Sequence, residues 1–131
     1  FHAPLAIVDK RRSGPNEAKA MNLIGEVDGR VALIVDDMID TGGTLLQAAG
    51  LLREQGATKV VACATHGVFS GAALSRISDP LFSKLVVTDT IPLSEEFEKL
   101  DHVEVVSIAP LIAETIRRIQ RNDSVSALLE C

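Results

Sequence analysis

The chain has 131 residues, of which 47% are hydrophobic and 3% aromatic, and its formal net charge at pH 7 is −5. This length fits one domain with a sizeable core, so residues 1–131 are interpreted as a single domain. The acidic balance argues against a general nucleic-acid-binding surface, which would be basic. Two widely separated cysteines, and the lack of a recognisable signal peptide or membrane span, predict a reducing, cytoplasmic setting.

Apolar runs alternate with polar or amphipathic segments from the start of the chain. A strand is expected at residues 5–9. The polar stretch at residues 10–17 contains Gly, Pro and three adjacent cations, which is typical of a mobile loop. Residues 18–27 fit no single element, although residues 21–24 within them are compatible with a short strand. A turn is expected at Asp28-Gly29.

The middle of the chain gives clearer signals. Residues 31–35 are an unbroken apolar run, which indicates a strand covered on both faces, as in a parallel sheet. A helix is predicted from about residue 43 to residue 55, and Gly56 stands where a left-handed C-terminal cap is expected. Further strands are predicted at residues 59–64, 84–88 and 103–108, and further helices at residues 70–78 and 110–120. This alternation predicts an α/β fold with a mainly parallel sheet flanked by helices.

The segment between the strand at residues 31–35 and the next helix carries the most chemical information. It reads Asp36-Asp37-Met38-Ile39-Asp40-Thr41-Gly42-Gly43-Thr44. In open α/β sheets, ligands bind at the carboxyl ends of the strands. The two glycines allow a ligand to approach the backbone closely. The N–H groups of residues 40–44 can converge on one anion at the start of the helix, and a phosphate suits that position.

The paired carboxylates of Asp36 and Asp37 need a different guest, because they would repel a phosphate. They suit hydroxyl groups, which donate hydrogen bonds to them, or a hydrated Mg²⁺ ion. A sugar phosphate supplies both a phosphate and a diol. The alternative is that the three acids merely form a turn, with Asp40 as the N-cap of the helix. The full pattern of strand, acids, glycines and threonines favours the sugar phosphate.

At these residues the sequence resembles the phosphoribosyl-binding loop of ribose-phosphate pyrophosphokinases, which have a phosphoribosyltransferase-like (type I) fold. Other segments resemble the same family. They are Asp9-Lys10-Arg11-Arg12 with Pro15-Asn16, which is similar to the flexible catalytic loop, and residues 65–71, Thr90-Ile91-Pro92 and Ser124-Val125-Ser126. The resemblance covers essentially the whole chain and corresponds to the C-terminal part of such an enzyme.

The resemblance implies a Mg²⁺-dependent transfer of diphosphate from ATP to C1 of ribose 5-phosphate. The products would be phosphoribosyl diphosphate and AMP, in nucleotide biosynthesis. Asp36 and Asp37 would contact the ribose hydroxyls directly or through Mg²⁺. The residues expected to hold the 5-phosphate are Asp40, Thr41, Gly42, Gly43 and Thr44.

The resemblance also assigns roles at the two ends of the chain. Lys10 and Arg12 would be catalytic, because they would close over the site and steady the ATP phosphates during transfer. Cations on a mobile loop can arrive after the substrates and exclude water. Ser124 and Ser126 match a region that binds a regulatory phosphate in many family members, and a plain surface tail is the alternative interpretation.

The family pattern contains segments that this sequence does not. Its N-terminal half supplies most of the ATP site, and its C-terminal half begins with a strand and a diphosphate-binding loop. We therefore expect the sheet to lack one strand, with an exposed apolar edge, and the isolated chain to be inactive. The family forms homo-oligomers, usually hexamers. Two other functions remain open: an ordinary phosphoribosyltransferase, and a non-catalytic, regulatory relative of the synthetase.

Overall fold

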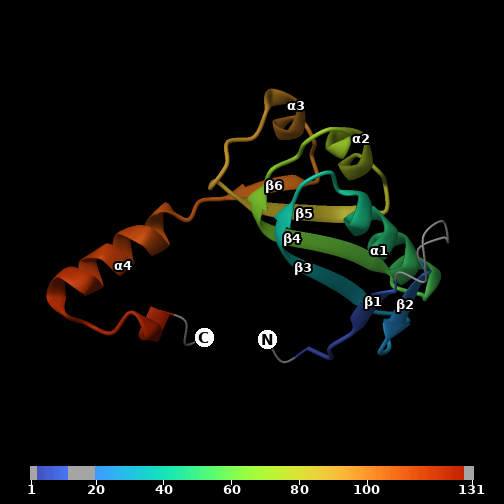
Figure 1. Ribbon diagram of the computed structural model, residues 1–131, viewed down its shortest axis with the longest axis horizontal. Coiled ribbons are helices and arrows are strands. Elements are labelled where there is room, and N and C mark those ends of the chain that lie inside the picture. Colours follow the sequence, from blue (N-terminus) through green and yellow to red (C-terminus); the bar gives the residue numbers. More distant parts are fainter. Residues whose placement is uncertain (1–2, 12–19, 129–131) are drawn as a thin grey trace.

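The fold is an open parallel sheet with a small antiparallel hairpin beside it. The computed structural model describes residues 3–11 and 20–128. Four parallel strands lie in the order β3-β4-β5-β6, so β3 forms one edge of the sheet (Figure 1). Their bounds are β3 Val31–Ile39, β4 Lys59–Gly67, β5 Phe82–Thr88 and β6 Val103–Val106. The predicted α/β class with a parallel sheet is confirmed.

The N-terminal hairpin pairs β1, Ile7–Arg11, with β2, Ala20–Ile24, in antiparallel register. The structure therefore resolves the ambiguous residues 18–27 in favour of the short strand with which residues 21–24 were compatible. The first strand begins two residues later than predicted, and it includes Lys10 and Arg11, which the sequence had placed in a loop. The reason is pairing: Lys10 lies opposite Met21 and Arg11 opposite Ala20, and these cross-strand partners could not be read from local composition.

Strand β3 extends four residues beyond its apolar run. It continues through Asp36 and Asp37 to Ile39, because its register with β4 persists as far as Met38 opposite His66 and Ile39 opposite Gly67. The sequence had suggested that the two aspartates follow the strand. In the structure they belong to it. Ladder hydrogen bonds outweigh the low strand propensity of Asp at these positions.

One face of the sheet carries the core. Side chains from β4 and β5 meet those of the helices there, and the largest fully buried ones are Val60, Leu85, Val87 and Ile77. The opposite face is open, contrary to the prediction that residues 31–35 are covered on both sides. Val31, Leu33 and Val35 are 60%, 47% and 71% exposed and alternate with the inward-facing Ala32 and Ile34. An apolar run alone cannot distinguish a strand covered on both faces from one covered on a single face.

The helices connect the strands. Helix α1, Gly43–Glu54, matches the prediction closely, and Gly56 follows it with a left-handed φ of 91°. Helix α2, Ala73–Ile77, is shorter than predicted, and the four-residue helix α3, Glu95–Glu98, was not predicted. Buried residues of α1, α2 and α3 belong to the same core cluster, so these helices cover the same face of the sheet (Figure 1).

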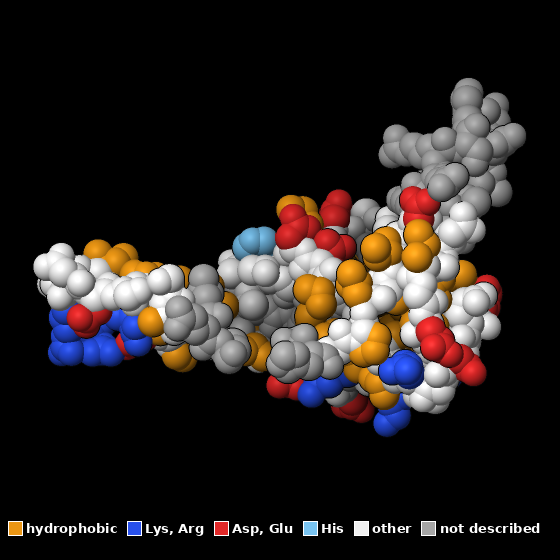
Figure 2. Space-filling model, turned by 90° about the horizontal axis from the view of Figure 1, so that it is seen from below, with side chains coloured by type: hydrophobic (Ala, Val, Ile, Leu, Met, Phe, Trp, Pro, Cys, Tyr) orange, Lys and Arg blue, Asp and Glu red, His pale blue; other side chains and the backbone are white. Residues whose placement is uncertain are grey.

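Helix α4, Ala109–Arg121, projects away from the sheet and is followed by a 3₁₀ turn, Ser126–Leu128 (Figure 1). None of its residues is buried, and its apolar side chains Leu111, Ile112, Ile116 and Ile119 are exposed. Figure 2 shows hydrophobic side chains on one side of this arm and Lys and Arg on the other. None of the helices in the described part of the chain combines the length and the apolar character needed to cross a membrane.

Candidate sugar-phosphate site

The turn between β3 and α1 encloses a small hollow of about 230 Å³. Its walls are the end of β3, the turn itself and the first residues of α1: Asp36, Met38, Ile39, Asp40, Thr41, Gly42, Gly43, Thr44 and Leu45. The hollow therefore lies at the carboxyl end of a parallel strand and at the start of a twelve-residue helix. This is the place where open α/β sheets bind ligands, and the helix start favours an anion.

Gly42 gives the turn its shape. It is the residue before the first turn of α1, and its φ of 71° and ψ of 1° are left-handed. Such a conformation costs a residue with a side chain roughly 1–2 kcal/mol. The backbone amides of Gly42 and Gly43 donate no hydrogen bond to another described residue. These two donors are therefore available to a ligand in the hollow.

Asp40 does not cap the helix. The N-cap is Gly42, and no side chain makes a cap hydrogen bond there. Instead, the Asp40 carboxylate accepts a hydrogen bond from the hydroxyl of Ser70, which lies between β4 and α2. The turn-and-cap interpretation of Asp40 is therefore wrong. The long-range contact with Ser70 accounts for the Asp40 side chain, and among the described residues the N-cap position of α1 has no side-chain cap hydrogen bond.

Asp36 and Asp37 differ in their relation to the hollow. Both are exposed, and each carboxylate accepts a hydrogen bond from the next amide: Asp37 N to Asp36 Oδ1 at 2.9 Å, and Met38 N to Asp37 Oδ1 at 2.8 Å. Asp36 lines the hollow, whereas Asp37 is not among the described residues around it. The structure therefore brings Asp36 together with the predicted phosphate loop and leaves Asp37 at its margin.

The carboxylates offer little to a metal ion held by protein alone. Among the described residues, no group of three or more His, Cys, Asp or Glu side chains could hold a metal ion. Mg²⁺, however, usually keeps several waters and binds through one or two carboxylates together with substrate oxygens. The exposed carboxylate of Asp36, beside the hollow, fits a Mg²⁺ ion shared with a substrate.

Two residues that the sequence did not single out hold the turn from the side of α2. The hydroxyl of Ser70 donates to Asp40, and Nη1 of Arg76 donates to the carbonyl oxygen of Thr41 at 2.7 Å. These pairs are 30 and 35 residues apart in sequence, so no local pattern could have revealed them. Nearby, His66 Nδ1 lies 2.9 Å from Thr90 Oγ1, which fixes the orientation of the imidazole at the end of β4.

Of the two predicted catalytic cations, Lys10 and Arg12, the described residues include only Lys10. Arg12 lies outside the described residues. Lys10 lies within β1, opposite Met21. Their assignment as catalytic residues therefore remains a prediction from the sequence.

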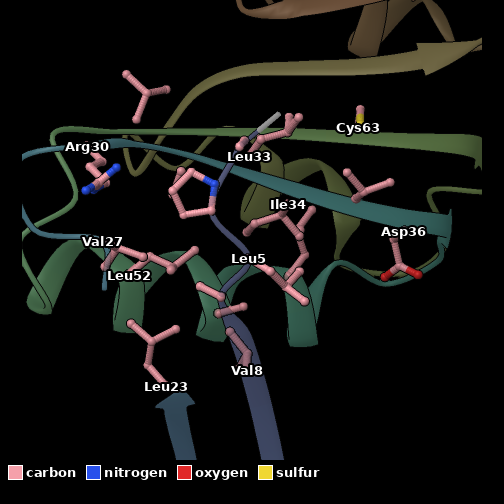
Figure 3. Close-up of a pocket in the computed structure, with 18 of the residues that line it drawn as sticks. Leu5, Val8, Leu23, Val27, Arg30, Leu33, Ile34, Asp36, Leu52 and Cys63 are labelled. Atoms are coloured by element: carbon pink, nitrogen blue, oxygen red, sulfur yellow. The ribbon is translucent and has the colours of Figure 1, made fainter. Parts of the chain in front are cut away.

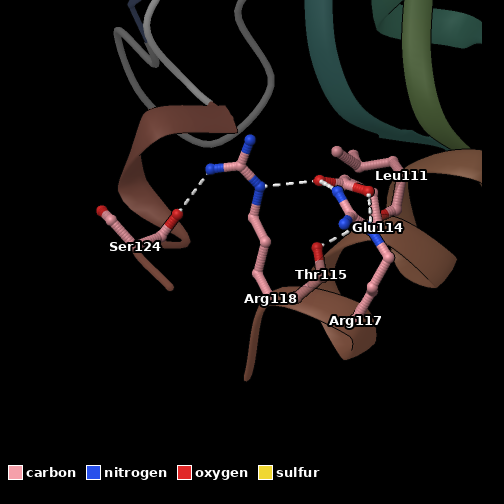
Figure 4. Close-up of polar contacts among 6 residues, drawn as sticks. All are labelled: Leu111, Glu114, Thr115, Arg117, Arg118 and Ser124. Carbon is pink, nitrogen blue, oxygen red and sulfur yellow. Dashed lines mark hydrogen bonds and ion pairs between the residues drawn. The ribbon is translucent and has the colours of Figure 1, made fainter. Parts of the chain in front are cut away.

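The predicted regulatory serines follow α4, in the segment where the chain turns back from the far end of that helix (Figure 1). The hydroxyls of Ser124 and Ser126 are 2.8 Å apart, and Arg118 Nη1 donates to the carbonyl oxygen of Ser124 at 2.8 Å. Glu114 accepts hydrogen bonds from both Arg117 and Arg118 (Figure 4). Hydrogen bonds from Arg117, and then from Arg118, lower the pKa of Glu114 to about 2.

A larger, mostly apolar groove runs along the outer edge of β3. Its volume is about 1020 Å³, and side chains from the residues before β1, from β1, β2, β3 and α1 converge on it, including Leu5, Val8, Ile34 and Leu52 (Figure 3). Asp36, Thr44 and Leu45 line both the groove and the hollow, so the two meet at these residues. The groove follows the edge of the sheet, where the sequence had predicted an exposed apolar edge.

Comparison with known proteins identifies the family. The family model for the phosphoribosyl synthetase-associated domain matches residues 7–130. The chain is 54% identical over 128 residues to ribose-phosphate pyrophosphokinase of Caldanaerobacter subterraneus, a match that covers 98% of this chain and 40% of the relative. It is 55% identical over 128 residues to the Neisseria meningitidis serogroup A protein of the same name, covering 98% of this chain and 39% of the relative.

A solved structure agrees with these matches. The phosphoribosylpyrophosphate synthetase of Mycobacterium smegmatis superposes with a TM-score of 0.79 at 41% identity, over 91% of this chain and 37% of that one. The chain therefore belongs to the phosphoribosyl synthetase-associated domain family. It spans about 40% of the length of the curated relatives it matches.

Proposed function

We propose that this chain carries the ribose 5-phosphate site of a ribose-phosphate pyrophosphokinase. In the proposed reaction, the hydroxyl oxygen on C1 of ribose 5-phosphate attacks the β-phosphorus of ATP. The bond from the β-phosphorus to the oxygen that joins it to the α-phosphorus breaks. AMP leaves with that oxygen, and the C1 hydroxyl loses its proton to solvent. The products are phosphoribosyl diphosphate and AMP. The proposal extends to a cytoplasmic homo-oligomer that uses Mg²⁺.

One observation carries the proposal: Gly42 and Gly43, whose amides donate to no other described residue, line a hollow that Asp36 also lines. In this proposal the 5-phosphate accepts hydrogen bonds from Gly42 and Gly43, while Thr41 and Thr44 supply hydroxyl donors and Asp40 stays bonded to Ser70. Asp36 accepts hydrogen bonds from ribose hydroxyls or binds a Mg²⁺ ion that they share. Asp37 would join this contact from the margin of the hollow.

The negative charge around the hollow explains why the proposal includes cations from outside it. The chain is acidic overall, and the hollow itself is lined by the carboxylates of Asp36 and Asp40. Transfer of a diphosphoryl group depends mostly on positioning the reactants and neutralising spread-out negative charge. Mg²⁺ supplies part of that neutralisation when bound, and Lys10 and Arg12 are proposed to supply the rest.

A thermal-shift experiment on the chain tests the binding site. Ribose 5-phosphate with Mg²⁺ should raise the midpoint of unfolding, because a ligand that binds only the folded state at about 100 times its Kd adds about 2.7 kcal/mol. Ribose without the phosphate should give a much smaller shift. Thr41→Ala combined with Gly43→Val should abolish the shift, whereas Lys99→Ala, at the exposed residue directly after α3, should leave it intact.

The longer protein tests the reaction. Release of AMP from ATP in the presence of ribose 5-phosphate is the expected result. Release of free diphosphate from phosphoribosyl diphosphate and a base would show a phosphoribosyltransferase instead. Binding of ribose 5-phosphate with neither product would show a non-catalytic relative.

A further inference from the structure

The segment between β4 and α2 wraps around the end of β3 and contacts the turn at successive points. The amides of Val68 and Phe69 both donate to the carbonyl oxygen of Ile39, at 3.0 and 3.1 Å. The next residue, Ser70, donates its hydroxyl to Asp40. Arg76 on α2 then reaches back, and its Nη1 lies 2.7 Å from the carbonyl oxygen of Thr41. Three consecutive residues of chain, 39–41, are thus held from one side.

The contact with Thr41 fixes the direction of an amide. In a trans peptide, the C=O of one residue and the N–H of the next point in opposite directions. The Arg76 guanidinium, which donates a hydrogen bond to the Thr41 carbonyl, therefore also sets where the Gly42 N–H points. Gly42 has no side chain, so its left-handed backbone has few conformational restraints of its own. Without Arg76, the Thr41–Gly42 peptide would be free to turn its carbonyl toward the hollow, where it would repel an anion.

The position of Arg76 also matters for charge. A methyl group built on Gly43 would lie 3.5 Å from Nη1 and 3.7 Å from Cζ of this arginine, so the guanidinium packs directly against the backbone of the phosphate turn. Within the described part of the chain, the side chains that line the hollow include two carboxylates and no cation. A guanidinium against the turn offsets part of this negative potential at short range.

We infer that Arg76 is a positioning residue for the phosphate of the sugar substrate, with Ser70 supporting it by holding Asp40. This inference rests on the proposed function. Arg76 acts through the Thr41–Gly42 peptide, so that both glycine amides point into the hollow before a ligand arrives. Preorganised donors bind an anion more tightly than donors that must first be turned.

Arg53 offers a matched control at the other end of α1. Its Nη1 donates to the carbonyl oxygens of Ala57, at 2.9 Å, and of Thr58. This is the same kind of contact, a guanidinium holding backbone carbonyls of a loop, but it lies beyond the C-terminal end of the helix. Arg53→Met removes a comparable structural tie without touching the phosphate turn.

The test is calorimetric binding of ribose 5-phosphate, with Mg²⁺ present, to the wild-type chain and its variants at a temperature where each is folded. Arg76→Met should weaken binding about tenfold or more, because a hydrogen bond from a charged group is worth about that factor. Arg76→Lys should bind with intermediate affinity, and Ser70→Ala should lose less than Arg76→Met. Arg53→Met should unfold at a lower temperature yet bind as the wild type does.

A second readout separates positioning from simple support. In ¹⁵N-labelled protein without ligand, Arg76→Met should move the Gly42 amide resonance, whereas Arg53→Met should not. Wild-type affinity in Arg76→Met would overturn the inference and leave the proposed function standing. No binding of ribose 5-phosphate to the wild-type chain would overturn both. If Arg76→Met does not fold, Arg76→Lys decides: affinity equal to the wild type overturns the inference.

Discussion

Replacing Gly42 by alanine separates backbone strain from loss of the phosphate site. Gly42 has φ 71°, and the atoms nearest to an added Cβ would be those of Ile77 and Arg76, at 3.6 Å or more, which is ordinary van der Waals contact. The cost of the substitution is therefore conformational, roughly 1–2 kcal/mol. For a domain of this size, that lowers the midpoint of thermal unfolding by roughly 3–8 °C.

Gly29 provides the matched control. Its φ is 68°, nothing lies within 4 Å of an added Cβ, and it sits in the turn before β3, at the opposite end of the strand from the hollow. Gly29→Ala should therefore lower the unfolding midpoint by a similar amount. Only Gly42→Ala should also reduce the stabilisation by ribose 5-phosphate, because the strained turn can relax by rotating the peptide that carries the Gly42 amide. Equal ligand shifts in the two variants would refute this reasoning.

Two further substitutions test the core and the projecting helix. Leu85→Ala removes a fully buried side chain and should lower the free energy of unfolding in urea by about 2–5 kcal/mol. Leu111→Ala, at a residue of α4 that is 48% exposed, should change that free energy by no more than about 0.5 kcal/mol. A large loss of stability in Leu111→Ala would show that α4 packs against the rest of the protein. Because its folded pKa of about 2 is below the ordinary 4.5, the Glu114 contacts stabilise fully above pH 4.5 and are lost as the pH falls toward 2. Helical circular dichroism should therefore fall more between these values in the wild type than in Glu114→Gln, and identical curves would contradict the assignment.

The sequence predicted the features that depend on neighbouring residues. The strand at residues 31–35, the helix that begins at Gly43 and the glycine after its end were all visible, because apolar runs and glycine positions are local signals. The turn proposed to bind the sugar phosphate could also be named from the sequence, because its residues are contiguous. The hollow in front of those residues is what a phosphate loop requires.

The features that the sequence missed depend on distant partners. Asp36 and Asp37 were assigned to a loop, because only the register with β4 extends the strand through them. Asp40 was considered as a helix cap, because its true partner, Ser70, is 30 residues away. Arg76 was overlooked for the same reason. The open outer face of β3 could not be foreseen from an apolar run that is equally suited to burial on both sides.

The most direct measurement is a titration of the ¹⁵N-labelled chain with ribose 5-phosphate in the presence of Mg²⁺. The amide resonances of Gly42 and Gly43 should shift progressively and saturate, with the largest changes in the molecule confined to the turn between β3 and α1. Ribose alone should leave these two amides almost unmoved. Unchanged Gly42 and Gly43 resonances at saturating ribose 5-phosphate, or larger changes elsewhere, would contradict the assignment of this turn as the phosphate site.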